Sequence, residues 1–394
     1  MPWLEVRPMD QKVLFIADYL RGGLTFSELC AMYTISRKTG YKWLNRYMDQ
    51  GFDGLRERSR RPANSPHRVP YAIRKAVIDL RKEKRRSVTP LGPKKIQALL
   101  GERHPTWEVP SETAIHNILK SEGLVSARKR RRRVFPGQQP FSPVRHANDL
   151  WTTDFKGEFR TGDGCWCYPL TVMDHESRFL LGCQVFDGSR YAETKEAFTR
   201  LFREYGMPWR IRSDNGTPFA SIAAGGLSRL SKWWIRLGIM PERIEPGKPQ
   251  QNGRHERMHK TLKEDTAIPP AASAARQQGL FDSFRQEYNY ERPHESLGQK
   301  TPGSQYQPSV RSMPEKLPEL DYPGHFKEAL VHSNGVIQHQ GHRVYISGLL
   351  KAEKLGLEEV ADGIWEAYYG PLKLGRFNMR QAKKSRNDYL KLNV

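Results

Sequence analysis

The chain has 394 residues with a net charge of +22, and residues 1–150 alone carry 30 basic and 14 acidic side chains. This length predicts several domains, and the basic excess indicates a polyanionic partner, most often nucleic acid. Four cysteines, no signal peptide and no run near the ~18 apolar residues of a membrane span argue against a disulfide-rich or membrane protein, so we expect a cytoplasmic one.

Residues 1–62 predict a helical domain with three helices between positions 10 and 50. Thr25 is suited to cap the second helix and Ser36 the third. A short helix, a tight turn and a following helix with a basic start are typical of a helix-turn-helix domain, whose second helix enters the major groove. The alternative is an ordinary three-helix bundle. We expect DNA contacts from Arg37, Lys38, Thr39, Tyr41 and Lys42.

Residues 68–126 predict a second helical domain of winged-helix-like type, again for DNA binding. Its last helix would begin after the N-cap Ser111 and stop near Gly123. The expected DNA contacts are Ser111, Thr113 and His116. A role as a dimerisation or spacer domain remains the alternative.

A basic linker over residues 127–144 contains six consecutive cationic side chains. Such a run repels itself and stays extended until it meets phosphate. We expect it to touch DNA through Arg128, Lys129, Arg130, Arg131, Arg132 and Arg133.

From residue 145 the pattern changes to strands and then to alternating helices and strands, which predicts a mixed five-stranded sheet with helices on its faces. The predicted strands are 149–159, 165–174, 178–186, 209–214 and 239–246. The predicted helices are 192–205, 227–237, 254–265 and 277–290. We place this α/β domain at residues 145–306.

Three acids in this domain are candidates for one metal site. Asp154 lies inside a strand, where propensity disfavours Asp, and Asp214 follows a strand and precedes Asn-Gly. A hairpin turn at Asp214 is the alternative, but the following TPFASIAAGG does not resemble a returning strand. Glu256 lies on a predicted helix. Carboxylates of this kind can hold paired Mg²⁺ ions, which promote in-line phosphoryl displacement.

The segment around Glu256, HERMH (255–259), also matches the His-Glu-x-x-His pattern of zinc peptidases. No third ligand follows at a familiar spacing, and the helix is strongly basic. Lys260 and Lys263 share the helical face of Glu256, which suits a helix lying on a DNA backbone.

A Pro-rich linker is predicted at residues 307–324, and residues 325–394 alternate apolar and polar side chains around an Asn-Gly turn. We expect a small β-barrel there, with DNA contact or self-association as its role.

The motifs WTTDFKG (151–157), RSDNGTPF (212–219), NGRHERMH (252–259) and YNYERPHESLGQKTPGSQY (288–306) resemble those of bacterial insertion-sequence transposases. These proteins form part of the retroviral-integrase superfamily, which has an RNase H-like fold. The resemblance covers about residues 10–306. It implies that Asp154, Asp214 and Glu256 hold Mg²⁺, for which Mn²⁺ can substitute, and that Lys260 and Lys263 contact donor DNA.

Two features depart from the family pattern: the integrase zinc-binding N-terminal module is absent, and the 42 residues from Asp214 to Glu256 exceed the usual spacing. The resemblance implies binding of an element's terminal inverted repeats, cleavage of the 3′ ends and transfer into target double-stranded DNA, in a bacterial nucleoid. Two ends must be processed together, so a dimer or tetramer is expected. The alternative is a transposase-derived DNA-binding regulator without catalysis.

Overall fold

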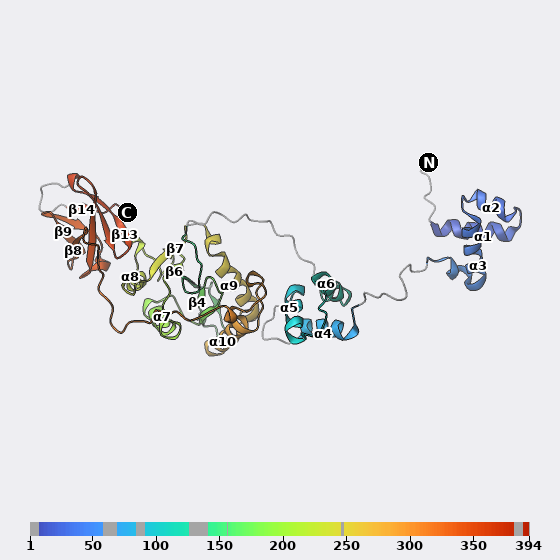
Figure 1. Ribbon diagram of the computed structural model, residues 1–394, viewed down its shortest axis with the longest axis horizontal. Helices are drawn as coiled ribbons and strands as arrows, with labels where there is room; N and C mark the ends of the chain where they lie inside the picture. The colour runs from blue at the N-terminus through green and yellow to red at the C-terminus, as the bar shows by residue number, and fades with distance from the viewer. Residues whose placement is uncertain are drawn as a thin grey trace. The chain divides into compact units, whose positions relative to one another are not determined.

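The computed structural model describes residues 8–57, 69–83, 91–125, 141–155, 157–245, 248–381 and 389–393. The chain divides into two compact units, residues 1–68 and 69–394, each described here by itself (Figure 1). The basic run 128–133 lies outside the described residues. Within the described ranges, no helix combines the length and apolar character needed to traverse a bilayer.

The first unit consists of α1 (Pro8–Arg21), α2 (Phe26–Met32), α3 (Arg37–Gln50) and a 3₁₀ turn at Gly51–Leu55. Thr25 caps α2 in a capping box with Glu28, and Ser36 caps α3 through the backbone N–H of Thr39. Both predicted caps are confirmed. The buried core of this unit includes Phe15, Leu29, Trp43 and Leu55.

The second unit begins with α4 (Tyr71–Lys82), α5 (Pro93–Arg103) and α6 (Glu112–Ser121). Ser111 caps α6, as predicted, by accepting the N–H of Ala114 at 3.3 Å. Val77, Ile96 and Ile115 are fully buried between the helices. The described residues from 69 to 125 contain helices but no strand, so they form no wing.

The five-stranded sheet of the core has the order β5-β4-β1-β6-β7. Its strands are β1 (Leu150–Phe155), β4 (Leu170–Asp174), β5 (Leu180–Gln184), β6 (Arg210–Ser213) and β7 (Met240–Arg243). β1, β6 and β7 are parallel, whereas β4 is antiparallel to both of its neighbours. The predicted mixed five-stranded sheet is confirmed.

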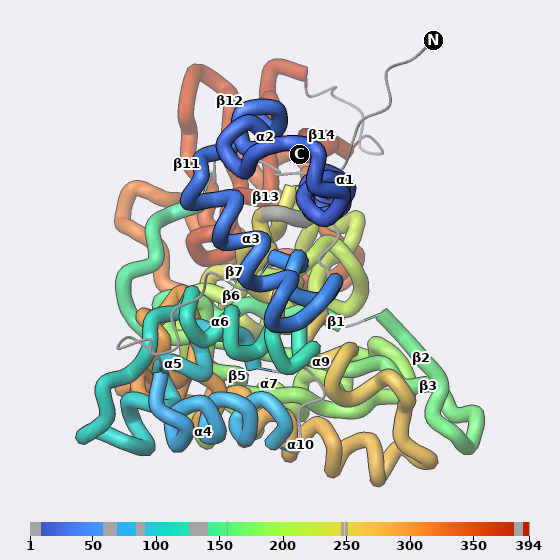
Figure 2. Tube along the Cα trace, turned by 90° about the vertical axis from the view of Figure 1, so that its right-hand side faces the viewer, coloured from blue at the N-terminus to red at the C-terminus, as the bar shows by residue number. Residues whose placement is uncertain are grey.

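The predicted strand over 165–174 is interrupted. Residues Trp166–Cys167 form β3, which pairs with β2 (Phe159–Arg160) as a separate hairpin. Figure 2 shows this hairpin extending away from the five-stranded sheet.

Helices cover both faces of the sheet because alternate strand residues point to opposite sides. On one face, Trp151 and Ile211 pack with Phe198 of α7 (Tyr191–Tyr205) and Trp234 of α8 (Arg229–Arg236). On the other face, Met173 and its neighbours pack with α9 (Gly253–Thr266) and α10 (Ala274–Tyr290). The side chains of Thr152 and Asp154, which alternate with that of Trp151, therefore face α9.

The segment from the end of α10 to Tyr306 packs against the sheet. Asn289 accepts the backbone N–H of Leu180 at 2.8 Å and donates to its carbonyl at 3.0 Å. Tyr306 donates its hydroxyl to Asn148 at 3.0 Å. These bonds fix the end of α10 and the following turn against the sheet.

The C-terminal strands form a four-stranded sheet, β13-β12-β11-β8, and a three-stranded sheet, β14-β10-β9. Their bounds are Lys327–Leu330 (β8), Val336–His339 (β9), His342–Tyr345 (β10), Lys354–Ala361 (β11), Ile364–Tyr369 (β12), Leu372–Asn378 (β13) and Leu390–Lys391 (β14). The expected β-barrel does not appear, since the described strands make two sheets over one core rather than one closed ring. Alternation specifies a buried face and cannot specify closure.

This domain packs directly on α8 and the 3₁₀ turn Ala224–Gly226 of the core. Leu227 and Ile235 belong to the same apolar cluster as Trp365 and Phe377. Glu353 pairs with Lys232 at 2.8 Å and with Arg236 at 3.0 Å.

Candidate active site at the ends of strands β1 and β6

Asp154 and Asp214 lie at the same end of two neighbouring parallel strands. In the ladder between β1 and β6, Thr152 is paired with Arg212, and each acid follows two residues later. Adjacent strands are about 4.8 Å apart, so the topology brings together two carboxylates that are distant in the sequence.

The buried Asp214 carboxylate lacks a full set of hydrogen-bond donors. Its Oδ1 is buried and has no hydrogen-bond partner among the described residues. Burial raises the pKa of Asp214, while a bond from the Gly216 backbone N–H opposes that rise. A buried anionic oxygen without a donor is what a bound cation would stabilise.

The absence of a side chain at Gly216 leaves space for this carboxylate. A Cβ built on Gly216 would lie 2.9 Å from Asp214 Oδ2, closer than real Cβ contacts allow. The Asn-Gly pair after Asp214 therefore serves the carboxylate as well as the turn.

Asp154 is held by contacts from β4 and α9. The Thr171 hydroxyl donates to the Asp154 backbone carbonyl at 3.0 Å. The Asp154 side chain lies near His259, whose Nδ1 is 3.7 Å from Asp154 Oδ2. This side chain of Asp154 is 24% exposed. The carboxylate is thus fixed from one side and open on the other.

His255 and His259 dock α9 onto the sheet through two threonines. His255 Nδ1 lies 2.8 Å from Thr152 Oγ1 and its Nε2 lies 2.7 Å from Thr171 Oγ1, while His259 Nε2 lies 2.6 Å from Thr171 Oγ1. Because the Thr171 hydroxyl donates its one proton to the Asp154 backbone carbonyl, its oxygen accepts hydrogen bonds from both imidazoles. Burial lowers the pKa of His255 to about 3, so that ring is neutral.

These contacts argue against the zinc-peptidase interpretation of HERMH. Both ring nitrogens of His255 are occupied by hydroxyls, which leaves no lone pair for zinc. In the sequence the two histidines stood out only through that pattern. Their structural role needed the positions of Thr152 and Thr171, which lie on other elements.

Glu256 lies on the first turn of α9 and is exposed. Successive helix residues are about 100° apart, so Glu256 points along the flank of the helix, away from the histidine side that faces the sheet. Across the described ranges, no three His, Cys, Asp or Glu side chains converge as a metal-binding group. The structure places Asp154 and Asp214 at the same end of adjacent strands and leaves Glu256 on the flank of α9.

The predicted DNA-contacting residues on helices are mostly exposed. Arg37, Lys38, Tyr41 and Lys42 are exposed at the start of α3 and Thr39 is half-buried, while Ser111, Thr113 and His116 are exposed at the start of α6. Lys260 pairs with Glu264 at 3.5 Å, and Lys263 is exposed one turn after Lys260 on the Glu256 flank.

A fourth acid of the core, Asp174, lies at the end of β4 and holds the following turn. It is fully buried and accepts bonds from the Asn148 N–H at 2.7 Å and from Ser177 N–H and hydroxyl at 2.8 and 2.6 Å. With all these donors inside the turn, Asp174 offers nothing to a metal.

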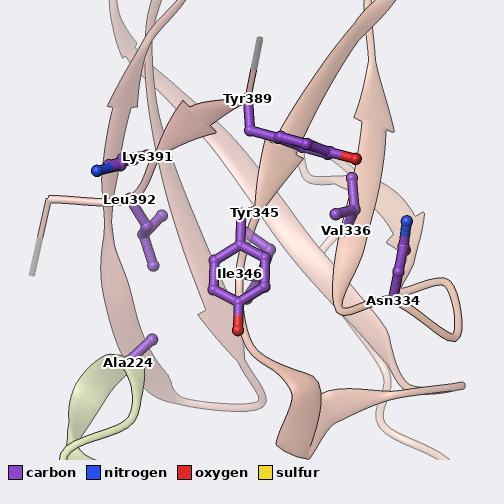
Figure 3. Close-up of a pocket in the computed structure, with 8 residues that line it drawn as sticks. All are labelled: Ala224, Asn334, Val336, Tyr345, Ile346, Tyr389, Lys391 and Leu392. Carbon is purple, nitrogen blue, oxygen red and sulfur yellow. The ribbon is translucent and has the colours of Figure 1, made fainter. Parts of the chain in front are cut away.

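A pocket of about 600 Å³ lies between the turn at Ala224 and the C-terminal strands (Figure 3). Its lining is largely apolar or aromatic, including Val336, Tyr345 and Ile346, and contains no acid and no histidine. Its lining therefore offers no carboxylate or imidazole ligand to a metal ion.

Comparison with known families agrees with this geometry. Residues 144–249 and 237–302 match two models described as "Integrase core domain". Residues 11–63 match a "Helix-turn-helix domain" and residues 39–119 a "Homeodomain-like domain". The chain carries an integrase core domain preceded by helix-turn-helix domains.

Its relatives include proteins of bacterial insertion elements. The IS407 uncharacterized 31.7 kDa protein of Burkholderia multivorans is 26% identical over 57% of this chain and 77% of its own length. The IS476 uncharacterized 39.2 kDa protein of Xanthomonas euvesicatoria is 26% identical over 66% of this chain and 71% of its own.

Among solved structures, the HTLV-2 integrase catalytic core domain in complex with magnesium is 16% identical with a TM-score of 0.32, covering 41% of this chain and 98% of that chain.

Proposed function

We propose that this protein is a DNA transposase, a polynucleotidyl transferase that cuts the 3′ ends of a mobile element and joins them to target DNA. The observation that carries the proposal is the placement of Asp154 and Asp214 at one end of adjacent parallel strands, with Asp214 Oδ1 lacking a partner. The integrase core match and the relatives from insertion elements support it.

The residues fit a hard divalent cation. Asp154, Asp214 and Glu256 would hold Mg²⁺ or Mn²⁺, because such ions prefer carboxylate oxygens. Bound there, the metal would supply Lewis-acid activation of the attacking oxygen and charge neutralisation at the scissile phosphate. Glu256 would join the two aspartates from the exposed flank of α9.

The remaining residues position DNA. Thr171 and His259 hold Asp154 in place, and Lys260 and Lys263 on the Glu256 flank would contact the donor backbone. The starts of α3 and α6, with the basic linker 127–144, would bind the terminal inverted repeats. A dimer or tetramer would bring two ends together, and the domain limits 1–62, 68–126, 145–306 and 325–394 stay predictions.

The test is an assay of end cleavage and strand transfer by the full chain on duplex DNA carrying the element's native ends. We expect nicked and joined products with Mg²⁺ or Mn²⁺, and none with EDTA. Tight DNA binding without any nicking under either metal would favour the alternative, a DNA-binding regulator derived from a transposase.

Gly216→Ala is expected to reduce cleavage by roughly 10- to 100-fold, because displacing a reacting group by about 1 Å costs on that order. The added Cβ would meet Asp214 Oδ2. Rates would be compared with those of Gly188→Ala, where a Cβ meets nothing within 4 Å. Equal rates for the two variants would show that Asp214 does not need its present position.

Mg²⁺ or Mn²⁺ is expected to raise the thermal unfolding midpoint of the wild type and to leave that of Asp214→Asn nearly unchanged. A ligand that binds the folded state stabilises it, and Asp214 is the buried carboxylate whose raised pKa reflects an unfavourable charge. Differential scanning calorimetry with and without metal measures this. An equal rise in both proteins would place the cation elsewhere.

A further inference from the structure

A polar cavity lies beside α9, on the flank opposite Glu256. Residues 256, 260 and 263 occupy one flank of the helix, whereas 254, 257 and 261 occupy the other, about 100° of rotation per residue. The latter residues line a cavity of about 540 Å³, together with the β4–β5 turn, the end of α10 and the loop around residue 294.

The cavity is strongly cationic. Its lining includes Arg178, Arg254, Arg257 and Arg292, with Glu295 as an acid in the wall. Arg254 lies 3.6 Å from Glu176, and Arg292 pairs with Asp265 at 3.2 Å. No salt bridge within the described ranges involves Arg178 or Arg257, although Glu176 and Glu295 interact with them at longer range.

Two buried polar nitrogen atoms in the wall lack partners. His175 is only 6% exposed, and its Nδ1 and the Nη1 of Arg178 have no hydrogen-bond partner among the described residues. Burial and the neighbouring arginines lower the pKa of His175 to about 2, and burial lowers that of Arg178 to about 10. Both shifts express the cost of holding positive charge at a buried position beside other arginines.

The backbone holds this arrangement in a strained form. Arg178 has φ +65°, in the left-handed region that residues other than glycine rarely adopt. The Asp174 and Ser177 bonds maintain the turn, and the Arg254 guanidinium donates to the His175 carbonyl at 3.0 Å. The fold therefore fixes the positions of His175 and Arg178.

We propose that this cavity binds a phosphate group of a DNA backbone, at a site separate from the catalytic flank of α9. Guanidinium groups match phosphate oxygens in charge and fork geometry, and the unpartnered Nη1 of Arg178 supplies a further donor. The inference rests on the proposed function for its choice of DNA over a free phosphate. A helix is about 10–12 Å across. DNA bound in this cavity would therefore contact the side of α9 opposite to the one that faces the reacting strand.

The test compares Arg257→Gln with Arg203→Gln, an exposed arginine of α7 outside the cavity. Affinity for a duplex carrying the element's end would be measured with EDTA at several salt concentrations, using the full chain. We expect Arg257→Gln to weaken binding and to reduce the slope of log affinity against log salt by about 1, and Arg203→Gln to change neither. Thermal unfolding of both variants verifies folding.

A second arm uses inorganic phosphate against chloride at equal ionic strength. We expect phosphate to raise the unfolding midpoint of the wild type and Arg203→Gln more than that of Arg257→Gln. A phosphate effect without a change in DNA binding would assign the cavity to free phosphate and overturn the proposal, as would no effect in either arm.

These outcomes are separable from the proposed function, because binding in EDTA requires no cleavage. A wild type that never nicks DNA but shows the altered salt slope in Arg257→Gln would leave the phosphate site intact. Unchanged DNA binding by the Arg257→Gln variant would contradict the phosphate site and would leave the proposed function unaffected.

Discussion

Asp154→Asn is expected to lower DNA cleavage and joining by at least about 10²- to 10³-fold. The substitution keeps the shape of the side chain and removes its charge, so the loss is that of one metal-binding carboxylate, which is worth several kcal/mol in such sites. The neighbouring His259 and Thr171 contacts should keep the amide in the same place. Single-turnover assays with Mg²⁺ and with Mn²⁺ measure the effect.

DNA binding should stay close to wild type in this variant, because the expected DNA-contacting residues lie on α3, α6 and the Glu256 flank of α9. Asp187→Asn, at an acid that is 64% exposed, is the matched control and should cleave normally. If Asp154→Asn still cuts and joins end-bearing DNA at the wild-type rate, the proposed active site is wrong.

His255→Ala is expected to destabilise the core by about 2–4 kcal/mol. His255 is fully buried, and its removal leaves a cavity together with the Thr152 hydroxyl without its ring partner. Because the same imidazole docks α9 on β1 and β4, cleavage should fall as well. Urea unfolding followed by fluorescence of the core tryptophans measures the free energy.

His332→Ala is the control, since that side chain is exposed and its loss should change stability by less than about 0.5 kcal/mol. Equal stability of the two variants would mean that the threonine–histidine bonds contribute nothing to docking. Loss of stability with normal cleavage would separate the packing of α9 from the positioning of Glu256.

Periodicity predicted most of the core. The strands of the five-stranded sheet, its four helices and the caps Thr25, Ser36 and Ser111 were all expected, since local side chains produce these signals. The interruption between β3 and β4 was missed although Pro169, which has no backbone N–H for a sheet ladder, lies within the run of residues 165–174. The prediction of a C-terminal barrel was wrong because closure of a sheet depends on which strands pair, and strand pairing is not determined by neighbouring residues.

The candidate site was only partly visible in the sequence. Asp154 and Asp214 stood out as acids in or after strands, whereas their adjacency came from the parallel pairing of β1 with β6. The threonine partners of His255 come from two strands, and the arginine cavity comes from four separate segments. No spacing rule connects such residues.

The sequence by itself determined the basic character of the chain, the order of its helices and strands, and the three acids singled out by their motifs. Tertiary structure decided which of these acids lie together, which flank of α9 each charge occupies, and that the C-terminal strands form two sheets. The reason is physical: helix and strand periods follow from neighbouring residues, whereas register, burial and electrostatic environment depend on segments that meet only in the folded chain.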